Sequence, residues 1–188
     1  SKFNTSLLKV ATKKGFTGTQ FMDFDSTVQE ANIEYPADIS MMQSIFKKGI
    51  KILEGLSDAG SVKAKDLLKR FNLKQINKDF KSHFFAKKSE KGFELKVEIF
   101  SKSYKLSKKI LKSIDEATSV FNNYELPWNY KKDLKQIREV APKLLEQINH
   151  FIKTGKVAEN KILSLHAKEV KCISKGKAGK KYEFGRKF

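Results

Sequence analysis

The stretch ISMMQSIFKKGIKILEGL, residues 39–56, is the strongest helix signal in the chain. Its apolar residues recur at spacings of three and four, which places them on one face of an α-helix. Tyr35-Pro36 disfavours helix immediately upstream, and Asp38 or Ser40 can cap the first turn. The apolar face consists of Ile39, Met42, Ile45, Phe46, Ile50, Leu53 and Leu56. This stretch therefore predicts a long amphipathic helix.

The same periodicity continues downstream. It predicts a helix over residues 62–84, a second over 97–121 and, after a turn at Leu126-Pro127, a third over 134–151. The first two should separate around residues 90–92, and Gly155 should close the third. Pro142 should kink or divide this last helix. We expect residues 39–154 to be predominantly helical.

Extended segments flank the helical region. Residues 21–25 alternate aromatic and acidic side chains without a helical stripe, which predicts a strand that ends near Asp25. Near the other end, residues 170–173 and 182–188 are β-prone and enclose a turn rich in Gly and Lys, which predicts a hairpin. The predicted fold class is therefore α+β, with a strand, about 115 helical residues and a hairpin.

The charge is strongly positive but unevenly distributed. The chain has 39 Lys or Arg and 21 Asp or Glu, a net charge of +18, which indicates an anionic partner. Residues 19–46 contain five carboxylates and no Lys or Arg, whereas the last 28 residues have a net charge of +7. Oxygen ligands beside cations suit metal-dependent phosphoryl transfer. Solvated or capping carboxylates and a solvated lysine turn would give the same pattern. The five carboxylates are Asp23, Asp25, Glu30, Glu34 and Asp38.

Several classes of site are disfavoured by composition. A lone Cys172 and three scattered His cannot supply a disulfide framework or the four close ligands of a structural zinc site. The turn KGKAGKK does not match the Walker pattern. No apolar run approaches the roughly 18 to 20 residues that span a bilayer, and the first residues lack a secretory apolar core. We expect a cytoplasmic protein without a membrane partner.

Two segments carry a resemblance. DSTVQEANIEYPAD, residues 25–38, resembles the region around the first catalytic aspartate of bacterial insertion-sequence DDE transposases. ILSLHAKEVKCISKGKAGKKYEFGRKF, residues 162–188, is similar to the stretch that follows a helical insertion in the same enzymes. The two segments cover about 41 of 188 residues, in the family's order. Residues 39–161 agree with the family only in length, helical character and placement.

The resemblance implies a partial RNase H-like fold with three parts. Residues 1–35 would hold the first strand of the catalytic core, residues 36–155 the helical insertion, and residues 156–188 the antiparallel hairpin. The family's second aspartate and its glutamate would follow Phe188, so we expect the chain to be an internal piece of a longer transposase. By itself it should be inactive. The complete enzyme would be a homo-oligomer.

The resemblance also implies a site. Asp25 would be the first catalytic carboxylate and a ligand of Mg²⁺ or Mn²⁺, in a two-ion centre that cleaves phosphodiester bonds and transfers strands of transposon-end DNA. Asp23, two residues earlier on the same strand face, competes for the ligand role. The alternative function is a non-enzymatic, basic, helical nucleic-acid-binding protein. The predicted contacts to the backbone of double-stranded DNA are Lys175, Lys177, Lys180, Lys181 and Arg186.

Overall fold

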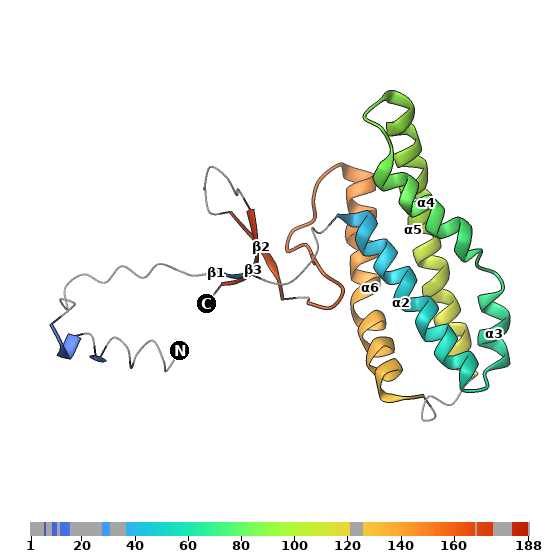
Figure 1. Cartoon of the computed structure of the whole chain (residues 1–188), viewed down its shortest axis with the longest axis horizontal. Helices are drawn as coiled ribbons and strands as arrows, with labels where there is room; N and C mark the ends of the chain where they lie inside the picture. The colour runs from blue at the N-terminus through green and yellow to red at the C-terminus, as the bar shows by residue number, and fades with distance from the viewer. Residues whose placement is uncertain are drawn as a thin grey trace.

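The structure is a computed structural model, and it describes residues 6, 9–10, 12–15, 28–30, 37–120, 126–167, 169–174 and 182–187. A helical bundle lies beside a small sheet (Figure 1). This arrangement confirms the α+β class. In chain order the main elements are β1 (Val28–Glu30), α2 (Asp38–Asp58), α3 (Val62–Leu68), α4 (Leu73–Phe85), α5 (Glu90–Ser119), α6 (Trp128–Thr154), β2 (Lys171–Ser174) and β3 (Tyr182–Lys187).

Helix α2 is the centre of the bundle. It contacts α3, α5 and α6, so it is covered on more than one side. The predicted apolar stripe is confirmed, since all its members are buried. Met41 and Ile52, which lie off that stripe, are buried as well, at 4% and 0% exposure. A helix packed on several sides needs a wider apolar surface than a helix that covers one face of a core.

Helices α5 and α6 complete the core against α2. Ile110 and Ile114 of α5 and Ile137 and Leu144 of α6 are at most 1% exposed and belong to one apolar cluster. Helix α6 ends at Gly155, whose φ of 67° lies in the left-handed region and whose N–H donates to the carbonyl of Phe151. Helix α6 runs through Pro142 without division, so of the two predicted effects of Pro142 the division is wrong, and the kink stays a prediction.

The helix predicted over residues 62–84 is two helices. Helix α3 ends at Leu68, and Asn72 begins α4 by accepting a hydrogen bond from the N–H of Gln75 at 3.0 Å. The next break also differs from the prediction, because Ser89 caps α5 and accepts from the N–H of Gly92 at 3.2 Å. Side-chain caps satisfy N–H groups that have no partner within the helix, and apolar periodicity alone does not locate them.

The three strands form one antiparallel sheet in the order β1-β3-β2. The predicted hairpin is confirmed, with Cys172 opposite Phe184. Strand β3 also pairs with β1, where Glu30 is opposite Gly185. The two ends of the helical region meet nearby, because the Nζ atom of Lys161 lies 2.6 Å from a carboxylate oxygen of Asp38. The helical bundle therefore begins and ends close to one point.

Among the helices of the described residues, none combines the length and the apolar character that a bilayer-crossing segment requires.

Candidate nucleic-acid interface

The residues predicted from sequence to form the site lie mostly outside the described residues. This holds for Asp25 and Asp23, and for the predicted phosphate contacts Lys175, Lys177, Lys180 and Lys181. Arg186 lies in β3, where its backbone is opposite Gln29 of β1. Strand β1 begins three residues after Asp25 and ends at the acidic residue Glu30. It pairs with β3 of the hairpin, so these residues and the hairpin adjoin in one sheet.

The described residues contain no group of three or more His, Cys, Asp or Glu side chains that could hold a metal ion. A divalent-metal site needs several oxygen ligands, and a two-ion site needs more than one carboxylate. No complete metal site therefore lies within the described part of the chain.

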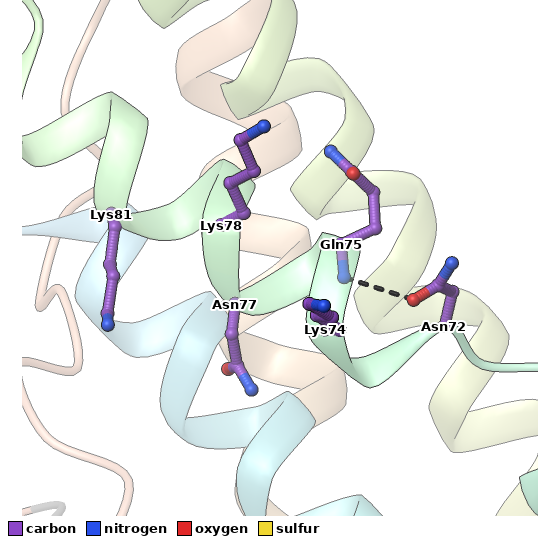
Figure 2. A pocket seen from close by; sticks show the side chains of 6 residues that line it. All are labelled: Asn72, Lys74, Gln75, Asn77, Lys78 and Lys81. Carbon is purple, nitrogen blue, oxygen red and sulfur yellow. Dashed lines mark hydrogen bonds between the residues drawn. The ribbon is translucent and has the colours of Figure 1, made fainter.

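The described residues do form a basic surface on α4. Lys74, Lys78 and Lys81 are all exposed, and we call these three residues the α4 lysine row. At 100° per residue their Cα positions fall within an arc of about 60°, and they span about 10 Å along the helix axis. Their side chains spread to either side of the helix (Figure 2). Together with Asn72, Gln75 and Asn77 they line a shallow surface hollow of about 570 Å³.

The opposite face of α4 explains why the lysine row faces solvent. Phe80 is 1% exposed and belongs to the main core, and the partly buried Ile76 packs beside it. Because these apolar residues lie on one side of a short helix, the lysines four residues apart on the other side must project outward. The Asn72 cap fixes the first turn, from which Lys74 emerges.

The lysine row contains no carboxylate. Asp79, the one acidic residue of α4, lies off the row and accepts a hydrogen bond from the side-chain amide of Gln75 at 2.7 Å. An anion that approaches the row therefore meets three ammonium groups and neutral amides. This arrangement suits a phosphate backbone, which carries one charge per about 3.4 Å of each strand.

Further cations extend the basic surface over α3 and α5. Residues 62–112 contain sixteen Lys or Arg and five Asp or Glu. Lys109 is held in place, since its Nζ donates to the carbonyl of Arg70 at 3.5 Å and lies 5.1 Å from the ring centre of Phe71. Some cations are neutralised locally: a hydrogen bond from Lys69 holds the pKa of Asp66 below its usual value. Among the described residues, Lys74, Lys78 and Lys81 have no such ion pair, so the α4 lysine row keeps its charges available to an anion.

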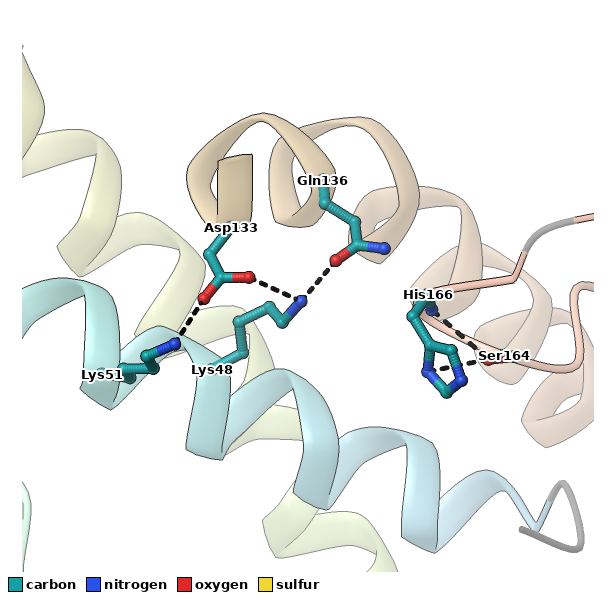
Figure 3. Close-up of polar contacts among 6 residues, drawn as sticks. All are labelled: Lys48, Lys51, Asp133, Gln136, Ser164 and His166. Carbon is teal, nitrogen blue, oxygen red and sulfur yellow. Dashed lines mark hydrogen bonds and ion pairs between the residues drawn. The ribbon is translucent and has the colours of Figure 1, made fainter. Parts of the chain in front are cut away.

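A second polar cluster joins α2 to α6 and is structural in character (Figure 3). The two carboxylate oxygens of Asp133 each lie 3.0 Å from an ammonium group, one from Lys48 and one from Lys51. Lys48 also donates to the side chain of Gln136. Burial opposes ionisation of Asp133, but hydrogen bonds from Lys51 and Lys48, with their charges, outweigh it and lower its pKa. Each charged group of the cluster has a partner of opposite charge within it, and the cluster ties α2 to α6.

Ser164 and His166, also drawn in Figure 3, form a turn and not a nucleophile with its base. The Ser164 hydroxyl accepts from the N–H groups of His166 and Ala167, each at 3.3 Å, and lies 3.1 Å from Nδ1 of His166. Ser164 is 5% exposed. A buried hydroxyl that caps two backbone N–H groups is a turn-stabilising group.

Comparison with protein-family models, curated proteins and solved structures gave no match to this chain. The function must therefore be argued from the residues themselves.

The lysine row is a feature that the sequence predictions missed. They placed the DNA contacts in residues 175–186, where lysines cluster in sequence. The signal for the row was present, because Lys74, Lys78 and Lys81 follow helical spacing opposite Ile76 and Phe80. Many other lysines precede and follow these three in the sequence. The three could therefore be assigned to one helix face only once the boundaries of α4 were known.

Proposed function

We propose that this chain binds duplex DNA through the α4 lysine row and its neighbouring cations, as part of a DDE transposase that acts on transposon ends. The observation that carries DNA binding is the carboxylate-free row of three exposed lysines on α4. A rigid helix that carries three lysines on one face can neutralise neighbouring phosphates and release their counterions, without reading the base sequence.

The transposase part of the proposal is supported by how the two resembling segments meet. They lie on either side of the helical region, yet β1 from the first pairs with β3 from the second. The ion pair between Asp38 and Lys161 brings together the first residue of α2 and a residue that follows the last residue of α6, Thr154, by seven positions. A helical unit whose two ends adjoin is what an insertion into a catalytic core of RNase H-like fold requires.

In this proposal Asp25 is the first catalytic carboxylate of the complete enzyme. Mg²⁺ or Mn²⁺ would supply Lewis-acid stabilisation of the phosphodiester in cleavage and strand transfer. The described residues add no three-ligand group to Asp25. The catalytic part therefore rests on the resemblance of residues 25–38, whereas DNA binding rests on the helical bundle.

A second candidate is a non-enzymatic nucleic-acid-binding protein. It is favoured by one observation: the lysine row, its cap and its core anchor all lie within residues 72–81 and need nothing from Asp25. The two candidates share DNA binding and differ in chemistry.

DNA binding is tested by salt-dependent titration of a duplex with the full chain. A variant with Lys74, Lys78 and Lys81 changed to Gln should bind more weakly, and the slope of log K against log salt should fall in magnitude by about 2 to 3. The matched control changes Lys143, Lys153 and Lys156 to Gln, three exposed lysines of α6 and its end, and removes the same charge. Equal losses in both variants would contradict a defined interface.

Chemistry is tested on the longer protein that supplies the downstream carboxylates. With Mg²⁺ or Mn²⁺ it should nick transposon-end DNA, and Asp25→Ala should abolish nicking while leaving duplex affinity unchanged. Duplex binding without metal-dependent nicking in the unaltered protein would favour the non-enzymatic candidate.

A further inference from the structure

We propose that the turn between α4 and α5 binds unpaired bases of DNA, with Phe85 as the main stacking surface and Phe93 as a second one. This inference rests on the DNA-binding function proposed above and specifies which form of DNA the helical bundle prefers. We call Phe84, Phe85 and Phe93 the aromatic tip.

The aromatic tip is exposed to an unusual degree. Phe85 is 84% exposed, Phe93 68% and Phe84 47%. They flank the short segment of residues 86–89, with Phe84 and Phe85 at the end of α4 and Phe93 in the first turn of α5. This turn is at the end of the α4–α5 hairpin that projects beyond α2 and α6 (Figure 1). Grouped aromatic side chains in solvent mark an interaction site more often than single ones do.

Each helix of the hairpin has an apolar residue that is buried more deeply than these rings. Phe80 of α4, one turn before Phe84, is 1% exposed, and Ile99 of α5 is 3% exposed. Helices α4 and α5 also contact each other. The aromatic tip is additional apolar surface that the fold leaves uncovered.

The turn itself is built to a definite shape. The N–H of Ser89 donates to the carbonyl of Lys87 at 3.0 Å, and the Ser89 hydroxyl caps α5 at the N–H of Gly92. A Cβ atom at Gly92 would overlap the carbonyl oxygen of Lys87, so only glycine allows the turn to lie this close to α5. The rings are therefore presented from a fixed backbone, which lowers the entropic cost of stacking.

Cations surround the rings on the α4 side. Phe85 lies on the same helical face as the α4 lysine row, four residues after Lys81. Beyond it, Phe93 lines a shallow hollow of about 560 Å³ together with three cations, Lys87, Lys88 and Lys96, and with Ser89 and one carboxylate, Glu90. A strand whose phosphates follow the lysine row would bring its next base to Phe85. Stacked aromatics beside a cationic track are the usual means of binding single strands.

The charges favour a narrow strand over a membrane surface or a broad polyanion. Glu90, Glu94 and Glu98 follow one another at four-residue spacing on α5 and are exposed. A flat anionic bilayer that covered the aromatic tip would meet all three carboxylates, whereas a single strand that follows the α4 lysine row to Phe85 and the hollow of Phe93 would pass only Glu90. The observations therefore favour unpaired DNA as the occupant.

The test compares a blunt duplex with the same duplex carrying a short 3′ extension of unpaired thymidines. The full chain should bind the extended DNA about tenfold more tightly. Phe85→Ala with Phe93→Ala should remove this preference and leave blunt-duplex affinity unchanged, while Phe85→Trp should keep it. A 2-aminopurine at the first unpaired position should change fluorescence on binding, and this change should vanish in the Ala variant.

Trp128→Ala is the matched control. Trp128 is also an exposed aromatic, at 73%, with the Nζ of Lys132 5.2 Å from its ring centre, but it is the first residue of α6, and α6 begins at the end of the bundle opposite the α4–α5 turn. It should leave the preference for extended DNA intact. Loss of the preference in the Trp128 variant would show that any exposed ring near a lysine suffices, and would overturn the assignment to the tip.

The outcomes separate this inference from the function on which it rests. If the chain binds blunt duplex but shows no preference for the extension, the aromatic tip proposal fails and DNA binding stands. If the chain binds neither the blunt duplex nor the extended duplex, the proposed function fails. If the Phe variants instead abolish self-association in sedimentation, or binding to anionic vesicles, with no effect on unpaired DNA, the tip is a protein or membrane contact and the inference is overturned.

Discussion

Gly49 of α2 lies directly against Ile110 of α5, so closely that a Cβ atom at position 49 would overlap the Ile110 side chain. A second glycine of α2, Gly55, has the same relation to the ring of Tyr130 in α6. Both contacts use the absence of a side chain to bring helix backbones together. The two glycines therefore set how closely α5 and α6 approach the central helix.

Gly49→Ala should destabilise the bundle, although alanine is the better helix former. The helix-propensity gain of about 1 kcal/mol is opposed by overlap with a fully buried β-branched side chain, and we expect a net loss of about 1 to 2 kcal/mol. Urea unfolding followed by circular dichroism measures it. Lys47→Ala, at an exposed position of the same helix, should change stability little. Equal stability of the two variants would contradict the packing argument.

The helical core could be predicted because its signal is local. The stripe from Ile39 to Leu56 repeats with the helical period, and each of its residues is buried. The role of Gly49 could not be predicted in this way, because a glycine inside a helix indicates close packing only when the opposite helix is known. The division of residues 62–84 was missed for a related reason, since the Asn72 cap is a single polar residue within an apolar pattern.

The sheet shows the same limit. The β-prone pieces around Cys172 and Phe184 predicted the hairpin, because the two pieces are close in the sequence. Pairing of β1 with β3 joins opposite ends of the chain, and no local pattern selects that partner. The α4 lysine row could be recognised only when the first and last residues of α4 were known, and apolar periodicity did not locate them. Asp25, the main sequence prediction, lies outside the described residues and stays a prediction.

Asp133 makes the stability of the bundle depend on acid pH. Hydrogen bonds and charge from Lys51 and Lys48 hold its pKa below the ordinary value against the opposing effect of burial. Its contribution is therefore complete above the unfolded pKa near 3.8 and is lost as pH falls through the folded value. The midpoint temperature of thermal unfolding should decrease when the pH falls below about 4.

Asp133→Asn should reduce this acid sensitivity and lower stability at pH 7 by about 1 to 2 kcal/mol, because Lys48, only 21% exposed, loses its charged partner. Asp115→Asn is a useful control, since its ion pair with Arg138 is more exposed, at 67% and 44%. Exposed pairs contribute little, so this change should have a small effect. An unchanged acid response in the Asp133 variant would contradict the assignment.

Two asparagines of α4 allow the effect of the N-cap position to be compared with that of an interior position of the same helix. Asn72→Ala removes the hydrogen bond to the N–H of Gln75 and should cost about 1 kcal/mol. Asn77→Ala, in the helix interior on the same hollow, should be neutral or slightly stabilising because alanine favours helix. Chemical denaturation of both variants measures the difference. If the two variants have the same stability, Asn72 does not act as the cap.

His83 should add a second pH dependence near neutral pH, at the α4–α5 end of the bundle. Its Nδ1 atom is buried and, within the described part of the chain, has no hydrogen-bond partner. Burial, and then the charge of Lys96, lower its pKa below 6.5. The folded state therefore binds this proton less tightly than the unfolded state, so the contribution of His83 to stability is complete above pH 6.5 and falls as the pH drops from there toward the folded pKa.

His83→Leu should remove the decrease in unfolding midpoint between about pH 6.5 and 5, whereas His150→Leu, at an exposed position of α6, should keep it. Hydrogen exchange should place the acid-sensitive opening at the end of α4. A decrease that persists in the His83 variant would assign it to another group.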